Sequence, residues 1–159
     1  MNSPSTMPWP AFRSLRGLRN GHLQTLAGAW WRANLAAPKG TVVHEVQLPD
    51  GDRLILHEDR PVGWQPGDRA ALLVHGLAGC HRSVYMVRIA RKLMARGVRV
   101  FRLDLRGCGA GRNLARHPYH AGRWGDVQAV AEPIVELCPD APLVVAGFSL
   151  GGNLVLRWL

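Results

Sequence analysis

Cysteine is scarce in this chain of 159 residues, which contains only Cys80, Cys108 and Cys138. An odd number of cysteines without C-x-x-C spacing indicates neither a disulfide framework nor a cysteine-based zinc site. Reduced thiols are typical of intracellular proteins, so we expect a cytoplasmic location, with no metal and no other cofactor.

Long apolar runs are also missing. No stretch approaches the roughly 20 apolar residues that a membrane-spanning helix needs, and the N-terminus has no signal-peptide apolar core. Residues 26–37 include Trp30, Trp31 and Leu35 but are interrupted by Arg32, which predicts an amphipathic surface helix. Peripheral contact with a membrane surface remains an alternative for this segment.

Acidic residues are few: the chain has 11 Asp and Glu but 20 Lys and Arg, which gives a formal net charge of +9. Such a balance can indicate phosphate binding, but the arginines fall singly along the chain, as at Arg53, Arg88 and Arg102. No run of like charge with interleaved aromatics is present. We therefore expect a solvated basic surface and no nucleic-acid partner.

The composition, 47% hydrophobic residues without an internal repeat, is typical of a globular domain. Residues 1–10 are polar and proline-rich and show no hydrophobic periodicity, so we predict a loose N-terminal tail there. We expect a helical segment over residues 11–40 and an α/β domain over residues 41–159.

Alternating patterns around the turn Pro49–Asp52 predict a β-hairpin of Thr41–Leu48 and Arg53–His57. Apolar runs and helical periods then alternate in the order Ala70–Val74 (strand), Ser83–Arg96 (helix), Val98–Leu105 (strand), Trp124–Leu137 (helix), Pro142–Phe148 (strand) and Leu150–Leu159 (helix). Pro133 should kink the second helix or mark its end. The fold class is α/β, a β-hairpin followed by a parallel βαβαβα sheet with helices on both faces.

The segment from Gly147 to Gly151 matches the G-x-S-x-G nucleophile elbow, with an apolar strand before it and a helix after it. The tight turn requires Gly147 and Gly151, and it lifts the hydroxyl of Ser149 clear of the sheet. We predict Ser149 as the nucleophile. The backbone N–H of Leu150, at the helix N-terminus, is then an oxyanion donor.

A second signal follows the first buried strand, where His75 and Gly76 open a loop that continues to Gly79. α/β-Hydrolases place their second oxyanion donor in this loop. We predict the backbone N–H of Leu77 as that donor, with His75 and Gly76 supporting the loop.

These motifs resemble the YheT-like group of α/β-hydrolases, which is related to the animal α/β-hydrolase-domain esterases and lipases. The resemblance covers nearly the whole chain through the segments 21–25, 48–52, 75–79, 106–109, 119–122 with Asp126, and 147–153. Gly21 departs from the proline usual in the group. The resemblance implies hydrolysis of short- to medium-chain carboxylic esters, with a small-molecule ester or lipid as substrate.

The family orders its catalytic residues as serine, acid and histidine, and the chain ends at Leu159. We therefore expect the acid and histidine to lie outside this chain, so that the fold is incomplete, the N-terminal half of a longer esterase. His117 and His120 follow the strand Val98–Leu105, but a structural or substrate-facing role suits them better than that of a base. Asp104 and Asp126 are expected to organise loops.

Without acid and base the chain alone should be weakly active or inactive. The strand Leu143–Ala146 would also present an open sheet edge. The alternative function is a non-catalytic fragment that self-associates or binds a partner through this edge. Hydrolysis and acyl transfer remain equally compatible with the serine chemistry.

Overall fold

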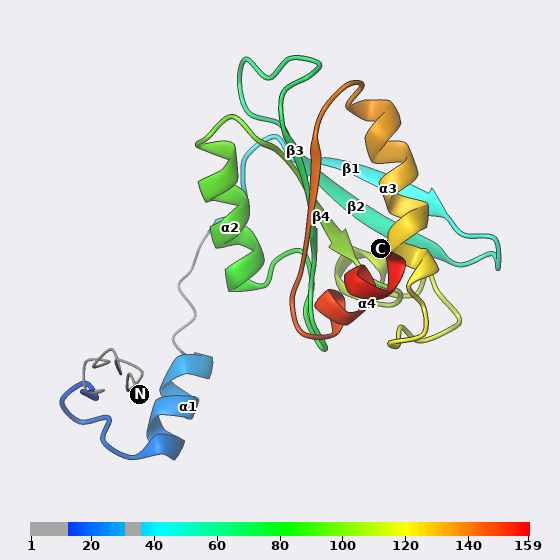
Figure 1. The fold of residues 1–159 in the computed structure, drawn as a ribbon. Coiled ribbons are helices and arrows are strands. Elements are labelled where there is room, and N and C mark those ends of the chain that lie inside the picture. The colour runs from blue at the N-terminus through cyan, green and yellow to red at the C-terminus, as the bar shows by residue number, and fades with distance from the viewer. Residues whose placement is uncertain (1–12, 31–35) are drawn as a thin grey trace, which may run out of the picture. The chain divides into compact units, whose positions relative to one another are not determined.

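A mixed five-stranded sheet in the order β1-β2-β4-β3-β5 forms the centre of the computed structural model (Figure 1). The structure describes residues 13–30 and 36–159. The strands are β1 (Val42–Gln47), β2 (Arg53–Asp59), β3 (Ala70–Val74), β4 (Arg99–Asp104) and β5 (Leu143–Gly147). The helices are α1 (Gly21–Trp30), α2 (Val84–Met94), α3 (Gly125–Leu137) and α4 (Leu150–Trp158), with a 3-10 turn, η1, at Gly109–Gly111. The α/β class predicted from the sequence is confirmed.

The hairpin of β1 and β2 turns around Gly51, whose φ of 85° lies in the left-handed region that glycine tolerates. Gln47 and Arg53 form the last pair of the two strands before the turn. β2 then pairs antiparallel with β4, whereas β3 lies parallel to both β4 and β5. The predicted order of a hairpin followed by a parallel sheet is therefore correct.

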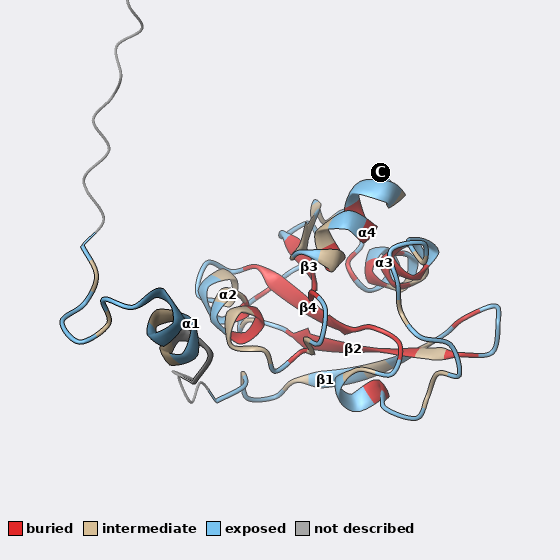
Figure 2. Ribbon diagram, turned by 90° about the horizontal axis from the view of Figure 1, so that it is seen from below, coloured by how far each residue is buried: buried red, intermediate tan, exposed pale blue. Residues whose placement is uncertain are grey.

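Helices cover both faces of the sheet, and each face has its own apolar core (Figures 1 and 2). On one face α2 buries Met86 and Ala90 against Ala71 and Leu73 of β3. On the other face α3 and α4 contribute Val127, Val130, Ile134, Leu154 and Val155 to the larger cluster. β3 is buried along its whole length because it lies between these two layers.

The helices that follow β3 and β4 lie close to their predicted ranges. Helix α3 ends at Leu137, as predicted, so Pro133 lies inside it and does not mark its end, and the next residue, Ile134, is fully buried in the core. Burial of an isoleucine offsets part of the cost of a proline in a helix, about 3 kcal/mol. Helix α2, predicted over Ser83–Arg96, begins at Val84 and ends at Met94.

The strand β5 lies at the edge of the sheet and pairs only with β3 among the described residues. Val144 of this strand is 60% exposed. The open edge expected at Leu143–Ala146 is present in this part of the chain.

The chain divides into two compact units, residues 1–33 and residues 34–159. In the first unit α1 begins at Gly21, five residues before the helix expected over residues 26–37, because Asn20 caps it by accepting the N–H of His22 at 2.8 Å. The remainder of that predicted helix includes residues 31–35, which lie outside the described residues, as does the tail predicted over residues 1–10. Within the described ranges, none of the helices has the length and apolar character that crossing a bilayer requires.

Candidate active site

Ser149 lies on the sharp turn between β5 and α4, with backbone angles of φ 51° and ψ −117°. A residue with a side chain rarely adopts a positive φ, and such a conformation costs about 1–3 kcal/mol. The turn is held by the N–H of Phe148, which donates to the carbonyl of Val74 at 3.0 Å, and by the N–H of Gly151, which donates to Phe148 at 2.9 Å. Ser149 is exposed, so its hydroxyl is accessible at the carboxyl end of β5.

Glycine is required on both sides of this serine by close backbone contacts. A Cβ atom on Gly147 would collide with the carbonyl oxygen of Gly151 and lie 2.5 Å from the nitrogen of Gly152. A Cβ atom on Gly151 would collide with the carbonyl oxygen of Val74 and lie 2.5 Å from that of His75. Backbone atoms cannot move aside as a flexible side chain can, so any larger residue would open the turn.

The loop after β3 passes directly beside Ser149. A Cβ atom on Gly76 would lie 2.9 Å from the carbonyl oxygen of Phe148 and 3.1 Å from Cβ of Ser149. Within residues 13–30 and 36–159, the N–H groups of Leu77 and Leu150 have no hydrogen-bond acceptor. Leu150 is also the first residue of α4, where free N–H groups and the helix dipole favour negative charge. Free N–H groups of this kind can stabilise an oxyanion.

Both tyrosines of the chain bond to this loop, a feature that the sequence pattern does not predict. The N–H of Gly76 donates to Oη of Tyr85 at 3.1 Å, and the N–H of Ala78 donates to Oη of Tyr119 at 2.8 Å. The two bonds lie on either side of Leu77 and hold its peptide from both ends. The one sequence feature that could have drawn attention to them is their rarity, because the chain has only two tyrosines.

His75, at the start of the loop, is fully buried and uses both ring nitrogens. Nδ1–H donates to the carbonyl of Gly76 at 2.7 Å, and Nε2 accepts the N–H of Leu105 at 3.2 Å. Burial lowers the pKa of His75 below its ordinary value, which favours this neutral tautomer. Neither nitrogen is free to take a proton from Ser149.

The other histidines of residues 36–159 also have partners of their own. His44 bonds to Glu58, His57 and His81 to Asp104, His117 to Asp52, and His120 accepts the N–H of Gly122. Asp126 is paired with Arg106. Within residues 36–159, therefore, no imidazole and neither of the two loop aspartates, Asp104 and Asp126, is bonded to Ser149.

Asp104 organises a buried polar cluster on the α2 side of the sheet. Its carboxylate accepts Nε2 of His57 at 3.0 Å, Nδ1 of His81 at 2.6 Å, and the N–H groups of His81 and Ala110 at 2.6 and 2.8 Å. Burial alone would raise the pKa of Asp104, but these hydrogen bonds hold it well below its ordinary value. The ligand atoms of His57, His81 and Asp104 lie within 4.8 Å of one another, as metal ligands would. Because both carboxylate oxygens already accept N–H groups, hydrogen bonding accounts for this arrangement.

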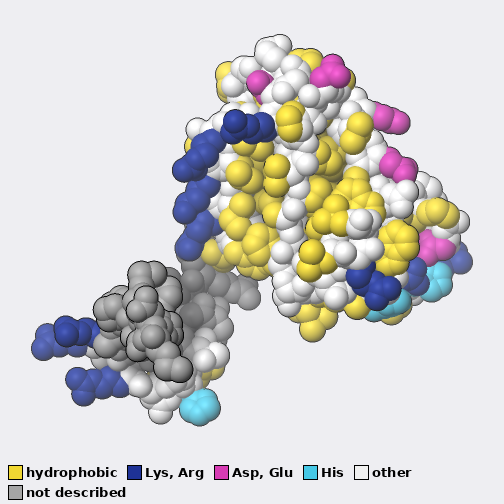
Figure 3. Space-filling model, in the orientation of Figure 1, with side chains coloured by type: hydrophobic (Ala, Val, Ile, Leu, Met, Phe, Trp, Pro, Cys, Tyr) yellow, Lys and Arg dark blue, Asp and Glu magenta, His cyan; other side chains and the backbone are white. Residues whose placement is uncertain are grey.

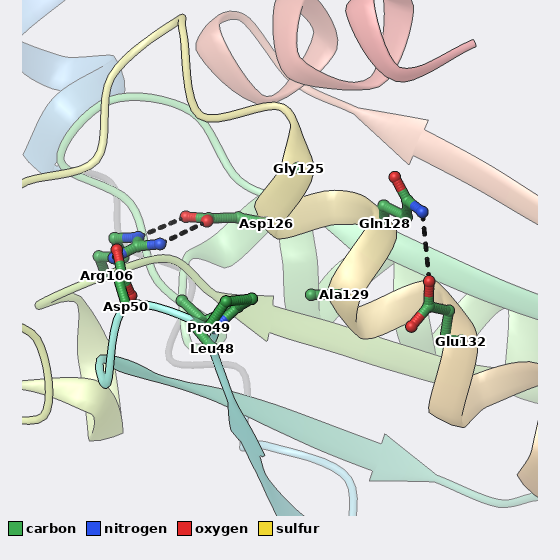
Figure 4. A pocket seen from close by; sticks show the side chains of 9 residues that line it. All are labelled: Leu48, Pro49, Asp50, Arg106, Gly125, Asp126, Gln128, Ala129 and Glu132. Carbon is green, nitrogen blue, oxygen red and sulfur yellow. Dashed lines mark hydrogen bonds and ion pairs between the residues drawn. The ribbon is translucent and has the colours of Figure 1, made fainter.

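A second network surrounds Arg106, which follows β4 (Figure 4). Its guanidinium pairs with Asp126 at 2.7 Å, and its Nη1 bonds to Asp50 and Asp52 at 2.7 and 2.6 Å. The hydrogen bonds that Arg106 donates to the carboxylates of Asp126 and Asp50 raise its pKa despite its burial. Asp50, Asp52 and His117 also bring ligand atoms within 4.8 Å of one another, but here Arg106 already supplies the positive charge. The network ties the hairpin turn to α3.

An open cavity of about 440 Å³ lies beside this network. It is lined by Leu48, Pro49, Asp50, Arg106, Gly125, Asp126, Gln128, Ala129 and Glu132 (Figure 4). None of the site residues predicted from the sequence lines it, so the cavity is not part of the site around Ser149.

Residues 71–159 match the family model described as the alpha/beta hydrolase fold. YheT of Escherichia coli, which is named as an esterase, is 30% identical over 146 residues, covering 91% of this chain and 42% of its own length. The mouse phospholipase ABHD3 is 31% identical over 88 residues, covering 55% of this chain and 21% of its own. The chain thus spans less than half the length of these curated relatives.

Solved structures share the same architecture. XC6422 of Xanthomonas campestris, described as an α/β serine hydrolase without a lid, superimposes with a TM-score of 0.64 at 27% identity, over 76% of this chain and 56% of that chain. Est1E of Butyrivibrio proteoclasticus gives a TM-score of 0.60 at 21% identity, over 73% of this chain and 44% of its own. At 21% identity the similarity to Est1E shows a shared fold and nothing more.

Proposed function

Because the chain belongs to the α/β-hydrolase family, we propose that it carries the nucleophile and the oxyanion hole of a serine carboxylic-ester hydrolase. The observation that carries the proposal is the strained backbone of Ser149 between β5 and α4, beside the loop that contains Leu77. Strain of this kind is retained where function needs it.

In the proposed reaction Oγ of Ser149 attacks the ester carbonyl carbon and loses its proton to a base. The carbonyl oxygen becomes an oxyanion, to which the N–H groups of Leu77 and Leu150 donate. The tetrahedral intermediate collapses, the alcohol leaves with a proton, and an acyl group remains on Ser149. Water then attacks the acyl-enzyme, and the acid product leaves as the serine regains its proton.

The base and the acid of this reaction are proposed to come from residues other than those of the present chain. Each histidine of residues 36–159 is bonded elsewhere, and the chain covers only 42% of YheT. Loss of triad members costs several powers of ten in rate. The 159-residue chain alone is therefore proposed to be nearly inactive, and the esterase is proposed to act in the cytoplasm.

The proposed substrate is a small ester or a lipid with a short to medium acyl chain. The names of relatives support the class of substrate, since YheT is named as an esterase and ABHD3 as a phospholipase, while the acyl length is the expectation drawn from the sequence resemblance. A phospholipid carries its acyl chains as carboxylic esters, so the proposed serine chemistry applies to a lipid as well as to a small ester.

The test is an assay of the protein expressed from its complete reading frame, with p-nitrophenyl acetate, butyrate and octanoate. Ser149→Ala should lower kcat by at least about 10⁴-fold. Ser14→Ala, which removes a hydroxyl far along the chain from the elbow, is the matched control and should retain activity. Full activity of Ser149→Ala would overturn the proposal.

The second candidate is a non-catalytic fragment that self-associates through the edge of β5. It is supported by the unpaired edge and by exposed apolar residues near it in the chain, Val144 at 60% and Leu156 at 76%. Size-exclusion chromatography with light scattering decides this point. A folded monomer at high concentration would exclude self-association.

A further inference from the structure

Helix α2 carries three positive charges and no negative one. Arg88, Arg91 and Lys92 are exposed, and the exposed Arg82 and Arg96 flank the helix at its two ends. None of these five side chains forms an ion pair with a carboxylate of the described residues. Their charge is therefore directed to the surroundings of the protein and not to its interior.

The spacing of these residues places the charges together. Positions 88, 91 and 92 lie three and four residues apart, and 96 follows 92 by four, so they share one face of the helix. The opposite face of α2 is buried through Met86 and Ala90. The five residues Arg82, Arg88, Arg91, Lys92 and Arg96 are called the basic face of α2 below.

The opposite side of the sheet has the reverse charge. Helix α3 carries the exposed acids Glu132 and Glu136 and no Lys or Arg, and its buried Asp126 is already paired with Arg106. In Figure 3 Lys and Arg form a line along the edge at α2, whereas Asp and Glu lie at the top and right, with a second group of Lys and Arg at the lower right. This asymmetry would orient the domain in front of a negatively charged surface.

We propose that the basic face of α2 docks on a membrane surface that contains anionic phospholipids. The face consists of three cations on one helix and two at its ends, which suits a flat array of phosphate groups. It carries no aromatic side chain on which a base could stack, as single-stranded nucleic acid would require. A lipid surface is therefore the occupant that this chemistry favours.

The position of α2 in the fold connects the proposed docking surface to the site around Ser149. The loop of residues 75–83 leads into α2, and within it Gly76 contacts the elbow of Ser149. Tyr85 of α2 bonds directly to Gly76 at 3.1 Å. Docking through α2 would hold the loop and Ser149 close to lipid esters, a consequence that rests on the proposed function, whereas the docking itself does not.

The test is co-sedimentation of the 159-residue chain with vesicles of phosphatidylcholine, alone or with 30% phosphatidylserine. We expect binding only to the vesicles with phosphatidylserine, and loss of binding in 0.5 M NaCl because the attraction is screened. The triple variant Arg88→Glu, Arg91→Glu, Lys92→Glu should bind at least about 100-fold more weakly, since each cation contributes about fivefold.

The matched control is Arg69→Glu, Arg112→Glu, Arg157→Glu, which changes the net charge equally at exposed positions outside α2. It should retain most of the binding, and circular dichroism should show that both variants are folded. Equal loss in both triple variants, binding to phosphatidylcholine alone, or tighter binding to DNA than to anionic vesicles would each overturn the proposal. Ser149→Ala should bind as the unmodified chain does, so docking and esterase activity can fail separately.

Discussion

The buried ring of His75 accepts a hydrogen bond at Nε2 from the N–H of Leu105, 3.2 Å away. His75 follows β3 and Leu105 follows β4, so the bond joins the carboxyl ends of two adjacent parallel strands. A protonated imidazole could not accept it, because both ring nitrogens would then carry a proton. The loop beside Ser149 thus depends on a neutral histidine.

Stability should therefore fall as the solution is acidified below the ordinary histidine pKa of about 6.5. The folded state lowers the pKa of His75, so below that pH the unfolded chain takes up a proton that the folded chain resists. The stabilisation is complete above about pH 6.5 and is lost as the pH falls toward the folded pKa. Urea unfolding of the 159-residue chain between pH 8 and 5.5 measures this dependence.

His75→Asn is the variant that isolates this residue. It should be less stable at pH 8, because the bonds to Gly76 and Leu105 are altered, and its stability should depend less on pH. The remaining histidines are unchanged in both proteins, so the difference between the two slopes belongs to His75. Identical slopes would show that His75 does not resist protonation.

The elbow glycines permit a sharper test of packing. Gly151→Ala should destabilise the chain by about 3 kcal/mol, because its Cβ would meet the carbonyl oxygens of Val74 and His75. Gly125→Ala is the control, since a Cβ there has no atom within 4 Å. Thermal unfolding should show a clear drop in Tm for the first variant and almost none for the second. A drop of similar size in both would mean that the contacts at Gly151 are not responsible.

The strands and the elbow could be predicted because their signals are local. Ala70–Val74 agrees with β3 at both ends, since a strand buried on both faces is a continuous apolar run. The glycines around Ser149 could be recognised for the same reason: the turn needs them at fixed positions. Such features depend on residues within a few positions of one another.

What could not be predicted depends on distant partners. Tyr119 bonds to Ala78 across 41 positions, and His57 to Asp104 across 47. Neither hydrophobic periodicity nor motif spacing in the sequence predicts such pairs. Pro133 shows a limit of a local rule: the rule allowed a kink or an end at this position, and the helix continues to the predicted Leu137 with Ile134 buried in the core.

Tyr119 provides a prediction about the proposed reaction. Tyr119→Phe keeps the ring but leaves the N–H of Ala78 without its acceptor, so the peptide of Leu77 should lose its fixed position. We expect kcat for p-nitrophenyl butyrate to fall about tenfold or more, because small misplacements of a catalytic group are costly. KM should change little, since the loop is proposed to act on the transition state.

Tyr85→Phe, which acts on the other side of Leu77 through Gly76, should shift kcat in the same direction. The assay uses the protein expressed from its complete reading frame. A lowered Tm with unchanged kcat in both variants would assign the two tyrosines a structural role only.

The charge of Asp104 should be essential to the polar cluster beneath α2. Asp104→Asn keeps the shape of the side chain, but its NH₂ group cannot accept a hydrogen bond, so His57 or His81 must lose an acceptor. A buried donor left without a partner costs about 1–3 kcal/mol, and the free energy of unfolding in urea at pH 7 should fall by this amount. Glu136→Gln removes the same charge at an exposed position of α3 and should change the stability by less than about 0.5 kcal/mol. If Asp104→Asn were as stable as this control, the hydrogen bonds to Asp104 could not be what holds its carboxylate ionised and the cluster together.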